Sequence, residues 1–330
     1  MPRHTVFARG LLRGRAAIVT GGGSGIGKAI TAELLSLGCS VLIASRKRDR
    51  LEAAAAALAA SCADGARIAF TTVDIRVESK VQSMVRRALR EFGRIDYLVN
   101  NGGGQFPSPT ADISMKGWET VLRLNLTGPF LCAKHCYNEW MQEHGGSIVS
   151  VVADFWQGFP GMGHTGAARA GVHNLTKTLA VEWADSGVRI NAVAPGVVFS
   201  TSAAANYDDP EILTGVTHRI PAQRLASVEE VSGCVVFLLS PAASYVTGET
   251  MKIDGGASVY GPMQFEVPDH KSWPVFGGWQ EGDPSTFKPV VEEGGGSGRD
   301  ISWSEKGGFG RAKEIGREKR GEEPPPKSRL

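Results

Sequence analysis

The sequence V-T-G-G-G-S-G-I-G at residues 19–27 decides the fold of this chain. Residues 16–19 form an apolar run that predicts a buried strand, and residues 28–35 have the apolar spacing of a helix. A strand, a glycine-rich turn and a helix make up a dinucleotide site, because glycines let the backbone approach a pyrophosphate and the helix N-terminus offers free N–H groups. The spacing T-G-x-x-x-G-x-G differs from the commoner G-x-G-x-x-G, and plain tight turns also produce it. The rest of the chain must decide between a binding turn and a plain one.

Strand-like and helix-like segments alternate along most of the sequence. We expect strands at residues 16–19, 41–44, 68–73, 97–99, 147–152, 189–193 and 251–253, and helices at 28–35, 50–60, 81–92, 118–141, 163–184 and 229–239. This alternation predicts an α/β fold, a Rossmann-type doubly wound parallel sheet of about seven strands with helices on both faces and right-handed crossovers. Ligands of such sheets bind outside the carboxyl ends of the strands.

The composition excludes several classes of protein. Hydrophobic residues make up 42% of the 330 residues, which is enough for a full core, and no run of 18 apolar residues predicts a membrane span. The net charge of +2 gives no reason to expect a nucleic-acid partner. The number of cysteines, five, is odd, which favours reduced thiols over disulfides. Cys132, His135 and Cys136 share a helix turn, but no second ligand pair follows at zinc-site spacing, so we predict no metal site.

The two ends of the sequence differ from its middle. Residues 1–14 are basic, with no acid before Glu33, which hints at a transit peptide; the lack of an amphipathic stripe favours a solvated arm. Residues 279–330 are rich in glycine, proline and charge, and we expect a low-complexity, disordered tail there. The last three residues, Ser328-Arg329-Leu330, are a basic variant of the S-K-L peroxisomal address. Three residues also match by chance, but the tripeptide predicts the peroxisomal matrix as the location and the peroxisomal import receptor as a partner.

The residues after the second expected strand indicate the cofactor. NAD-specific sites place an acid there to bind the adenosine ribose, whereas this chain has Ser45, Arg46 and Lys47. The planar guanidinium of Arg46 suits a 2′-phosphate, and Lys47 is placed to assist it. Solvated surface charge would explain the basic residues but not the missing acid. We therefore predict NADP (NADPH) as the cofactor.

Several further motifs together resemble the short-chain dehydrogenase/reductase family over residues 11–258. They are the glycine turn, Asp74, the run Asn100-Asn101-Gly102-Gly103, Asn125, Pro195-Gly196 and Asp254-Gly255-Gly256. Within that family, residues 101–106, 166–171 and 266–270 resemble peroxisomal trans-2-enoyl-CoA reductases. The resemblance implies one NADP-binding reductase domain over residues 15–278, acyl-CoA as substrate, and a homo-oligomer, specifically a tetramer.

The resemblance also implies which residues bind the cofactor. Gly21, Ser24, Gly25, Ile26 and Gly27 would hold the pyrophosphate. Asp74 and Ile75 would flank the adenine, Asn101 and Gly102 would contact the adenosine ribose side, and Pro195, Gly196 and Thr201 would border the nicotinamide. Arg169 would hold the nicotinamide ribose.

The catalytic positions depart from the family pattern. The family uses a serine, a tyrosine and a lysine, the lysine lying thirteen residues before the glutamate of an L-A-x-E segment. Counting back from Glu182 puts Arg169 at the lysine position, Thr165 at the tyrosine position and Val152 at the serine position. Threonine is too weak an acid to protonate an alkoxide, and arginine does not release its proton, so carbonyl reduction by the usual route is not expected.

Reduction of a C=C bond conjugated to a thioester fits these residues better. Hydride goes to Cβ, negative charge collects on the thioester oxygen, and a proton then reaches Cα, from water or from a side chain. Arg169 adds positive charge, and Asn125 binds water or holds backbone at the site. We therefore predict an NADPH-dependent trans-2-enoyl-CoA reductase. A 2,4-dienoyl-CoA reductase and a catalytically silent NADP-binding subunit remain as alternatives.

Two histidines are open candidates for the acid. In some enoyl-CoA reductases of this type a tyrosine lies eight residues further on, in Y-N-L-T-K, and here that frame begins with His173. Thr165, Arg169 and His173 are spaced by four and share a helix face, although His173 lies about 6 Å further along the axis than Arg169. A histidine titrates near neutrality and can act as an acid. His173, and His164 beside Thr165, are therefore either catalytic or polar interface residues.

Overall fold

The computed structural model describes residues 5–63, 65–200 and 216–260. Several features expected from the sequence lie outside these residues: Thr201, the segment 266–270, the tail 279–330 and the tripeptide Ser328-Arg329-Leu330. Within the described part of the chain no helix is long and apolar enough to cross a membrane.

One parallel sheet organises the described residues, and its strand order is β3-β2-β1-β4-β5-β6-β7. The strands are β1 Ala16–Thr20, β2 Ser40–Ser45, β3 Ile68–Thr72, β4 Tyr97–Asn100, β5 Gly146–Val151, β6 Val188–Pro195 and β7 Thr250–Ile253. All six pairings are parallel, for example Val19 beside Ile43 on one side and beside Val99 on the other. The predicted doubly wound α/β fold is confirmed, and the order reverses at β1 and β4, which is where such sheets bind ligands.

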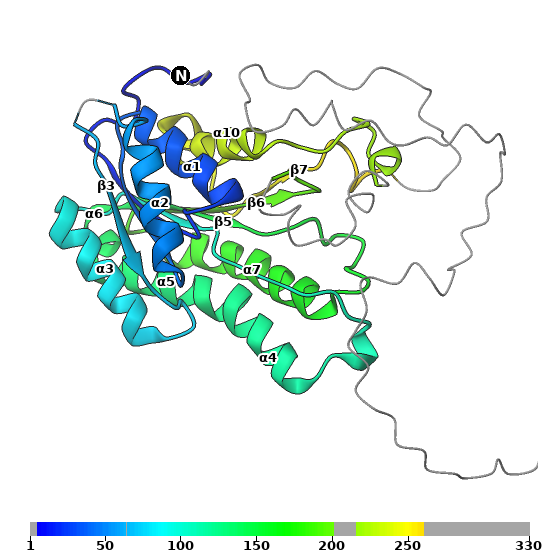
Figure 1. The fold of residues 1–330 in the computed structure, drawn as a ribbon. Helices are drawn as coiled ribbons and strands as arrows, with labels where there is room; N and C mark the ends of the chain where they lie inside the picture. Colours follow the sequence, from blue (N-terminus) through cyan, green and yellow to red (C-terminus); the bar gives the residue numbers. More distant parts are fainter. Residues whose placement is uncertain (1–4, 64, 201–215, 261–330) are drawn as a thin grey trace, which may run out of the picture. The chain divides into compact units, whose positions relative to one another are not determined.

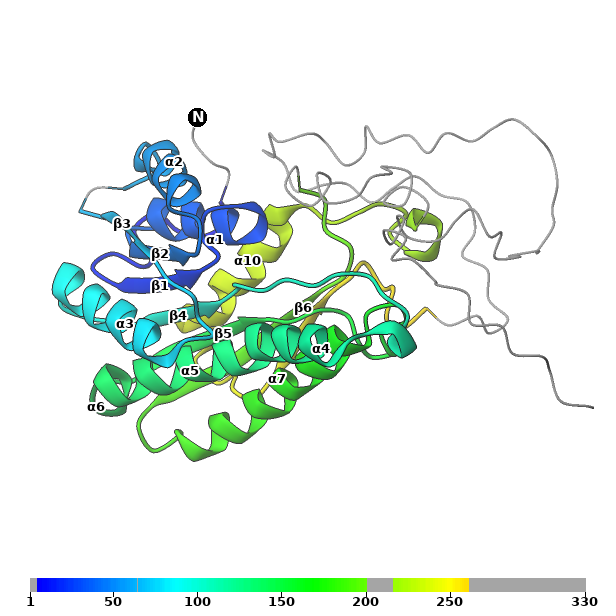
Figure 2. The same ribbon diagram turned by 60° about the horizontal axis from the view of Figure 1, so that its bottom comes forward.

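Helices cover both faces of this sheet, as Figures 1 and 2 show. The longer ones are α1 Gly25–Ser36, α2 Arg48–Ala59, α3 Glu78–Phe92, α4 Met115–Leu122, α5 Gly128–Cys136, α7 Gly163–Glu182 and α10 Val228–Leu239. One core cluster joins α1, α2 and α10 to the sheet, and a second joins α3, α5 and α7 to its other face. Apolar residues of the central strands are fully buried from both sides, as expected of a parallel sheet between two helical layers.

The expectation of a single helix over residues 118–141 is wrong in one respect. The segment is interrupted by two π-helical turns, η2 Arg123–Thr127 and η3 Tyr137–Met141, and it ends in the short α6 Gln142–His144. Apolar spacing is almost the same in α- and π-turns, so the sequence pattern does not reveal them. The first of these turns contains Asn125, and π-turns of this kind recur at functional sites.

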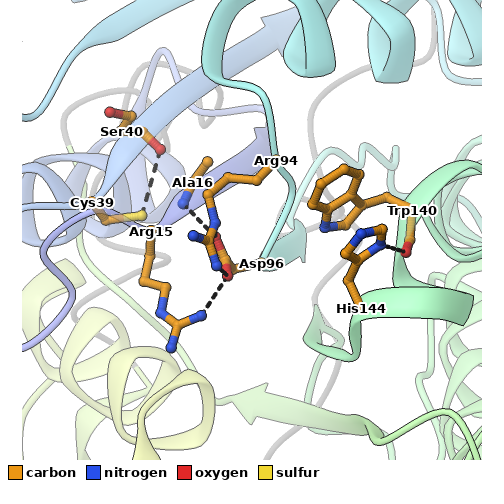
Figure 3. A network of polar contacts seen from close by, with 8 residues as sticks. All are labelled: Arg15, Ala16, Cys39, Ser40, Arg94, Asp96, Trp140 and His144. Carbon is orange, nitrogen blue, oxygen red and sulfur yellow. Dashed lines mark hydrogen bonds and ion pairs between the residues drawn. The ribbon is translucent and has the colours of Figure 1, made fainter.

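A polar cluster ties the amino ends of β1 and β4 together (Figure 3). The carboxylate of Asp96 accepts hydrogen bonds from Arg15 at 2.8 Å, from Arg94 at 2.6 and 2.7 Å, and from the N–H of Ala16 at 2.9 Å. The hydrogen bond from Arg15 to Asp96 raises the pKa of that guanidinium. Because this cluster lies at the opposite edge of the sheet from the ligand-binding edge, its role is to hold two strands in register.

The cysteines are all free thiols. Burial raises the pKa of Cys132 to about 12, and Cys136 is buried beside it. His135, in the same helix turn, has its Nε2 3.0 Å from Glu78. Among the described residues no group of three or more metal-binding side chains comes together.

Candidate active site

The glycine turn between β1 and α1 has the geometry of a binding turn. Gly21 has a φ of +69° and Gly25 a φ of +49°, a region that residues with a side chain adopt at a cost. A Cβ on Gly27 would lie 2.3 Å from the carbonyl oxygen of Gly21. The backbone is therefore closed on itself here, and only glycines allow the turn to lead directly into the N-terminus of α1.

Asn101 and Thr20 lock this turn to the end of β4. The Oγ1 of Thr20 accepts the N–H groups of Asn101 at 3.1 Å and Gly102 at 2.9 Å. In return, Nδ2 of Asn101 donates to the carbonyl oxygens of Thr20 at 3.0 Å and Gly21 at 3.3 Å. The side chain of Asn101 and the N–H of Gly102 are thus both committed to shaping the turn.

A cavity of about 350 Å³ opens at this edge of the sheet. Eleven residues expected from the sequence to bind the cofactor line it: Gly21, Ser24, Ile26, Gly27, Ser45, Arg46, Lys47, Asp74, Ile75, Asn101 and Gly102. Gly25, Pro195 and Gly196 are described but are not among the lining residues, and neither is Arg169. The fold therefore brings these eleven residues into one hollow, and their contacts with adenosine and pyrophosphate stay a prediction.

A basic corner of the cavity follows β2. Ser45 ends the strand, and its buried Oγ has no hydrogen-bond partner within the described chain. Arg46 and Lys47 are exposed, and no hydrogen bond or ion pair joins either of them to another described residue. Sequence reasoning missed Arg50, which also lines the cavity from the first turn of α2. The signal was its position four residues after Arg46, since α2 begins at Arg48 and Arg50 lies in its first turn.

Among the described residues that line the cavity, Asp74 is the one acid, and its charge is paired. Arg76 binds the carboxylate of Asp74 through Nε and Nη2 at 2.7–3.2 Å. This hydrogen bonding lowers the pKa of Asp74 to about 2, so the group is a carboxylate with its charge paired. The net charge of the corner is accordingly positive, which suits an anionic ligand.

Arg169 is a buried guanidinium on α7. Its Nη1 donates to the carbonyl oxygen of Val151, the last residue of β5, at 2.7 Å. Its Nε is buried without a partner in the described chain, and burial lowers the pKa of Arg169 to about 10. Nη2 lies against Gly103, where a Cβ would come within 2.5 Å of it. The guanidinium thus lies behind the loop that follows β4, with donors still unused.

Asn125 is fully buried in the π-turn between α4 and α5. Its Oδ1 accepts the N–H of Gly104 at 3.0 Å, and its Nδ2 donates to the carbonyl oxygen of Gly104 at 3.0 Å. The amide therefore satisfies both backbone groups of one glycine and holds the loop after β4. This is the backbone-holding role that the sequence left open beside water binding.

Thr165 and His164 lie at the start of α7, and both are fully buried. The Nδ1 of His164 accepts the N–H of Thr165 at 2.9 Å, which places the ring proton on Nε2. The ring of Phe106 meets that of His164 edge-on, with centroids 4.4 Å apart. The Oγ1 of Thr165 and the Nε2 of His164 have no partner within the described residues, so this helix start carries unused polar atoms.

His173 lies two turns further along α7, against β7. Its Nδ1 is 2.8 Å from the Oγ1 of Thr250, and its ring packs edge-on to Trp156 with centroids 5.0 Å apart. Burial, and then the charge of Lys177, lower the pKa of His173. The ring is not among the groups that line the cavity. A catalytic role for His173 stays a prediction, and its contacts are those of a packed, hydrogen-bonded side chain.

Known proteins are similar to this chain over most of its length. The family model described as "Enoyl-(Acyl carrier protein) reductase" matches residues 21–258. A peroxisomal 2,4-dienoyl-CoA reductase of Danio rerio is 38% identical over 262 residues, 78% of this chain and 86% of the relative. A Bacillus subtilis (strain 168) relative, named as a 2,4-dienoyl-CoA reductase that produces (2E)-enoyl-CoA, is 35% identical over 246 residues, 73% of this chain and 96% of the relative.

A solved structure is similar as well. The citronellol catabolism dehydrogenase AtuB of Pseudomonas aeruginosa PAO1 is 47% identical, with a TM-score of 0.69. The match covers 77% of this chain and 99% of that one. The two relatives and this solved structure each match about three quarters of the chain.

Proposed function

We propose that this chain, which belongs to the short-chain dehydrogenase/reductase family, reduces the 2,3 double bond of trans-2-enoyl-CoA to acyl-CoA with NADPH. It is an oxidoreductase of the type that acts on CH–CH bonds, in peroxisomal fatty acid metabolism. The proposal rests on one observation above all. Where the family has serine, tyrosine and lysine, this chain has Val152, Thr165 and Arg169, and only the guanidinium among them is a charged donor.

The bound cofactor would supply hydride, and the residues present fit it. The closed glycine turn leaves no room for a Cβ beside the backbone, as close approach of a pyrophosphate requires. Ser45 offers a buried hydroxyl without a partner, and Arg46, Lys47 and Arg50 offer three cations around it. That donor set suits a 2′-phosphate and has no acid free to bind a 2′-hydroxyl, which supports NADPH over NADH.

The chain's own residues provide the electrostatics of the reaction. Arg169 would hold the nicotinamide ribose and place a positive charge where electron density moves onto the thioester oxygen. Its lowered pKa, about 10, still leaves it protonated at neutral pH, so it is a donor and not an acid in turnover. Asn125 keeps the loop of Gly103 and Gly104 in place against that guanidinium. Thr165 contributes a hydroxyl that has no other partner in the described chain.

A second candidate has support from the comparisons. Relatives from Danio rerio and Bacillus subtilis are named as 2,4-dienoyl-CoA reductases, so a dienoyl thioester is the alternative substrate. In both reactions hydride addition would place negative charge on the thioester oxygen before a proton reaches carbon, and the same guanidinium would stabilise either charge. A catalytically silent NADP-binding subunit is the third possibility, since a buried Thr165 replaces the proton-donating phenol.

One assay series separates these functions. Purified protein is incubated with NADPH, and the cofactor absorbance is followed with trans-2-enoyl-CoA, with 2,4-dienoyl-CoA and with no acyl-CoA. Consumption with the 2-enoyl thioester supports the proposal, and consumption only with the dienoyl thioester supports the alternative. Tight NADPH binding without turnover supports the silent subunit. A further arm, citronellol with NADP⁺, tests the activity that the name of AtuB describes; turnover there alone would contradict the proposal.

The proposed location is the peroxisomal matrix. The Danio rerio relative is named as a peroxisomal enzyme. In this chain, Ser328-Arg329-Leu330 is the segment proposed to bind the import receptor. Deleting these three residues from a fluorescent fusion should leave the protein in the cytosol, and unchanged organelle localisation would contradict the proposal. The proposed homotetramer is testable by light scattering of the purified chain.

A further inference from the structure

We propose that Asp154 is the acid that delivers the proton to Cα of the reduced thioester. The inference rests on the proposed function and names the group that the altered family positions leave undefined. It deepens the site by adding a carboxyl group from the end of β5 to the guanidinium and amide already described.

The backbone puts Asp154 at the ligand-binding edge of the sheet. The residue lies just beyond β5, and its N–H donates to the carbonyl oxygen of Pro195, the last residue of β6, at 3.1 Å. Three positions earlier, Val151 accepts the hydrogen bond from Arg169. Asp154 thus follows the same strand end that positions the guanidinium, beside the Pro195-Gly196 segment proposed to border the nicotinamide.

A second carboxylate, Asp254, approaches the same place from the end of β7. A Cβ on Gly196 would lie 3.0 Å from the Cα of Asp254, so the turn after β7 packs directly on the turn after β6. The two carboxyl oxygens of Asp254 accept the N–H groups of Gly256 at 3.0 Å and Ser258 at 2.9 Å. Burial alone would raise the pKa of Asp254, but hydrogen bonding by Ser258 and Gly256 and the charge of Lys252 together outweigh it, and the pKa is lowered.

The surroundings of Asp154 shift its pKa in the opposite direction. Burial raises its pKa, the charge of Asp254 adds to that shift, and the backbone N–H of Trp156 and the charge of Lys252 oppose it only in part. No described cation lies within ion-pair distance of Asp154, and the ammonium of Lys252 instead sits 4.7 Å from the centroid of the Trp156 ring. When the surroundings of two neighbouring carboxyl groups shift their pKa values in opposite directions, the group with the raised pKa can carry a proton and the other stays an anion. Here Asp154 is the first and Asp254 the second.

The other groups at this edge are poor proton donors. Thr165 is an alcohol, Arg169 keeps its proton, and Asp74 is a carboxylate paired with Arg76. His164 is fully buried, its Nδ1 accepts the N–H of Thr165, and its ring meets that of Phe106 edge-on, so it is not exposed to take a proton from solvent. Asp154, by contrast, is only partly buried, so it can regain a proton from solvent after each turnover.

The step balances as an acid-assisted addition across the double bond. A bound NADPH would supply the hydride that forms the C–H bond at Cβ, and the electron pair of the C=C bond would move onto the thioester oxygen. The O–H bond of the Asp154 carboxyl then breaks, a C–H bond forms at Cα, and the thioester carbonyl is restored. The carboxylate of Asp154 takes up one proton from solvent, so each turnover consumes one hydride and one proton.

The test compares Asp154→Asn with the wild type and with Asp185→Asn, an exposed carboxylate beyond the far end of α7. Loss of a general acid should lower kcat for trans-2-enoyl-CoA about 10²–10⁴-fold. KM and the NADPH dissociation constant, read by fluorescence, should change little. Wild-type kcat should fall as pH rises through the raised pKa of Asp154, because the acid must be protonated; Asp154→Asn should lose this dependence, and Asp185→Asn should keep it.

Two further measurements keep the inference open to refutation. Infrared titration of the carboxyl groups should show one that loses its proton at unusually high pH in the wild type and none such in Asp154→Asn. If Asp154→Asn fails to fold, Asp154→Glu takes its place in the test. This variant retains an acid and should keep the pH dependence.

Retention of the full rate and pH dependence in Asp154→Asn, or their loss in His173→Gln instead, would overturn the inference alone. No NADPH consumption by the wild type with any enoyl-CoA would overturn the proposed function and this inference together.

Discussion

The guanidinium of Arg169 donates to the carbonyl oxygen of Val151 across 2.7 Å, which fastens the second turn of α7 to the carboxyl end of β5. Lysine, the family's usual residue here, has a flexible point charge, whereas arginine brings a planar fork with several donors. One donor is used on the strand, and Nε is left buried without a described partner. The same side chain can therefore anchor the helix and still present positive charge to the site.

Gly103→Ala should displace this guanidinium. A Cβ there would lie 2.5 Å from Nη2 of Arg169 and 3.0 Å from Oδ1 of Asn125. The guanidinium cannot move aside without breaking its hydrogen bond to the carbonyl oxygen of Val151. We expect kcat/KM for the enoyl thioester to fall at least about tenfold, since transition-state contacts are sensitive to small displacements. Gly104→Ala is the matched control, because its Cβ would meet only a side-chain carbon of Leu124, at 3.3 Å. Equal effects of the two substitutions would contradict this account.

Asn125→Ala should destabilise the loop that follows β4. Both the N–H and the carbonyl oxygen of Gly104 would lose their partner in a buried place. Leaving two backbone groups unsatisfied should lower the free energy of unfolding by about 2–4 kcal/mol, measured by urea denaturation. Asn174→Ala, an exposed position on α7, should change it by less than about 0.5 kcal/mol. A similar small change at Asn125 would show that water replaces the amide at no cost.

Arg46→Ala should weaken NADPH binding selectively. The residue lines the cavity beside the unpartnered Ser45 hydroxyl, and loss of a charge-assisted hydrogen bond costs about 1.5–3 kcal/mol, or roughly 10–150-fold in Kd. NADH binding, which lacks the 2′-phosphate, should be almost unchanged. Arg48→Ala is the control, because this neighbouring arginine does not line the cavity and lies 3.9 Å from Glu52 on the surface. Equal losses for the two cofactors, measured by fluorescence titration, would contradict the assignment.

Asp96→Asn should lower stability without touching catalysis. The substitution removes the negative charge that Arg15 and Arg94 share at the amino edge of the sheet (Figure 3). We expect about 1–3 kcal/mol less free energy of unfolding, with kcat unchanged at 25 °C because the site lies at the other edge. Glu91→Gln, which removes the exposed partner of Arg87, should cost at most about 1 kcal/mol. A large loss of kcat in folded Asp96→Asn would mean that the two edges are coupled.

The structure shows which parts of the prediction depend on local pattern. The expected strands, and the expected starts of the helices that follow them, lie within a few residues of the observed ones. Buried parallel strands are short apolar runs, and the glycine turn after the first strand is distinctive. The π-turn around Asn125 was missed, since one extra residue in a helical turn hardly alters the apolar spacing. Arg50 was missed because its place in the cavity depends on how α2 begins and not on a motif.

The sequence by itself determined the doubly wound sheet, the glycine turn and most of the residues that line the cavity beside that turn. Those features follow from residues that are near one another along the chain and whose backbone demands are local. Only the tertiary structure decided which backbone groups Arg169, Asn125 and Asp154 bind. Their partners Val151, Gly104 and Pro195 belong to other segments, and hydrogen bonding and burial between distant segments appear only when the strand ends are brought to one edge.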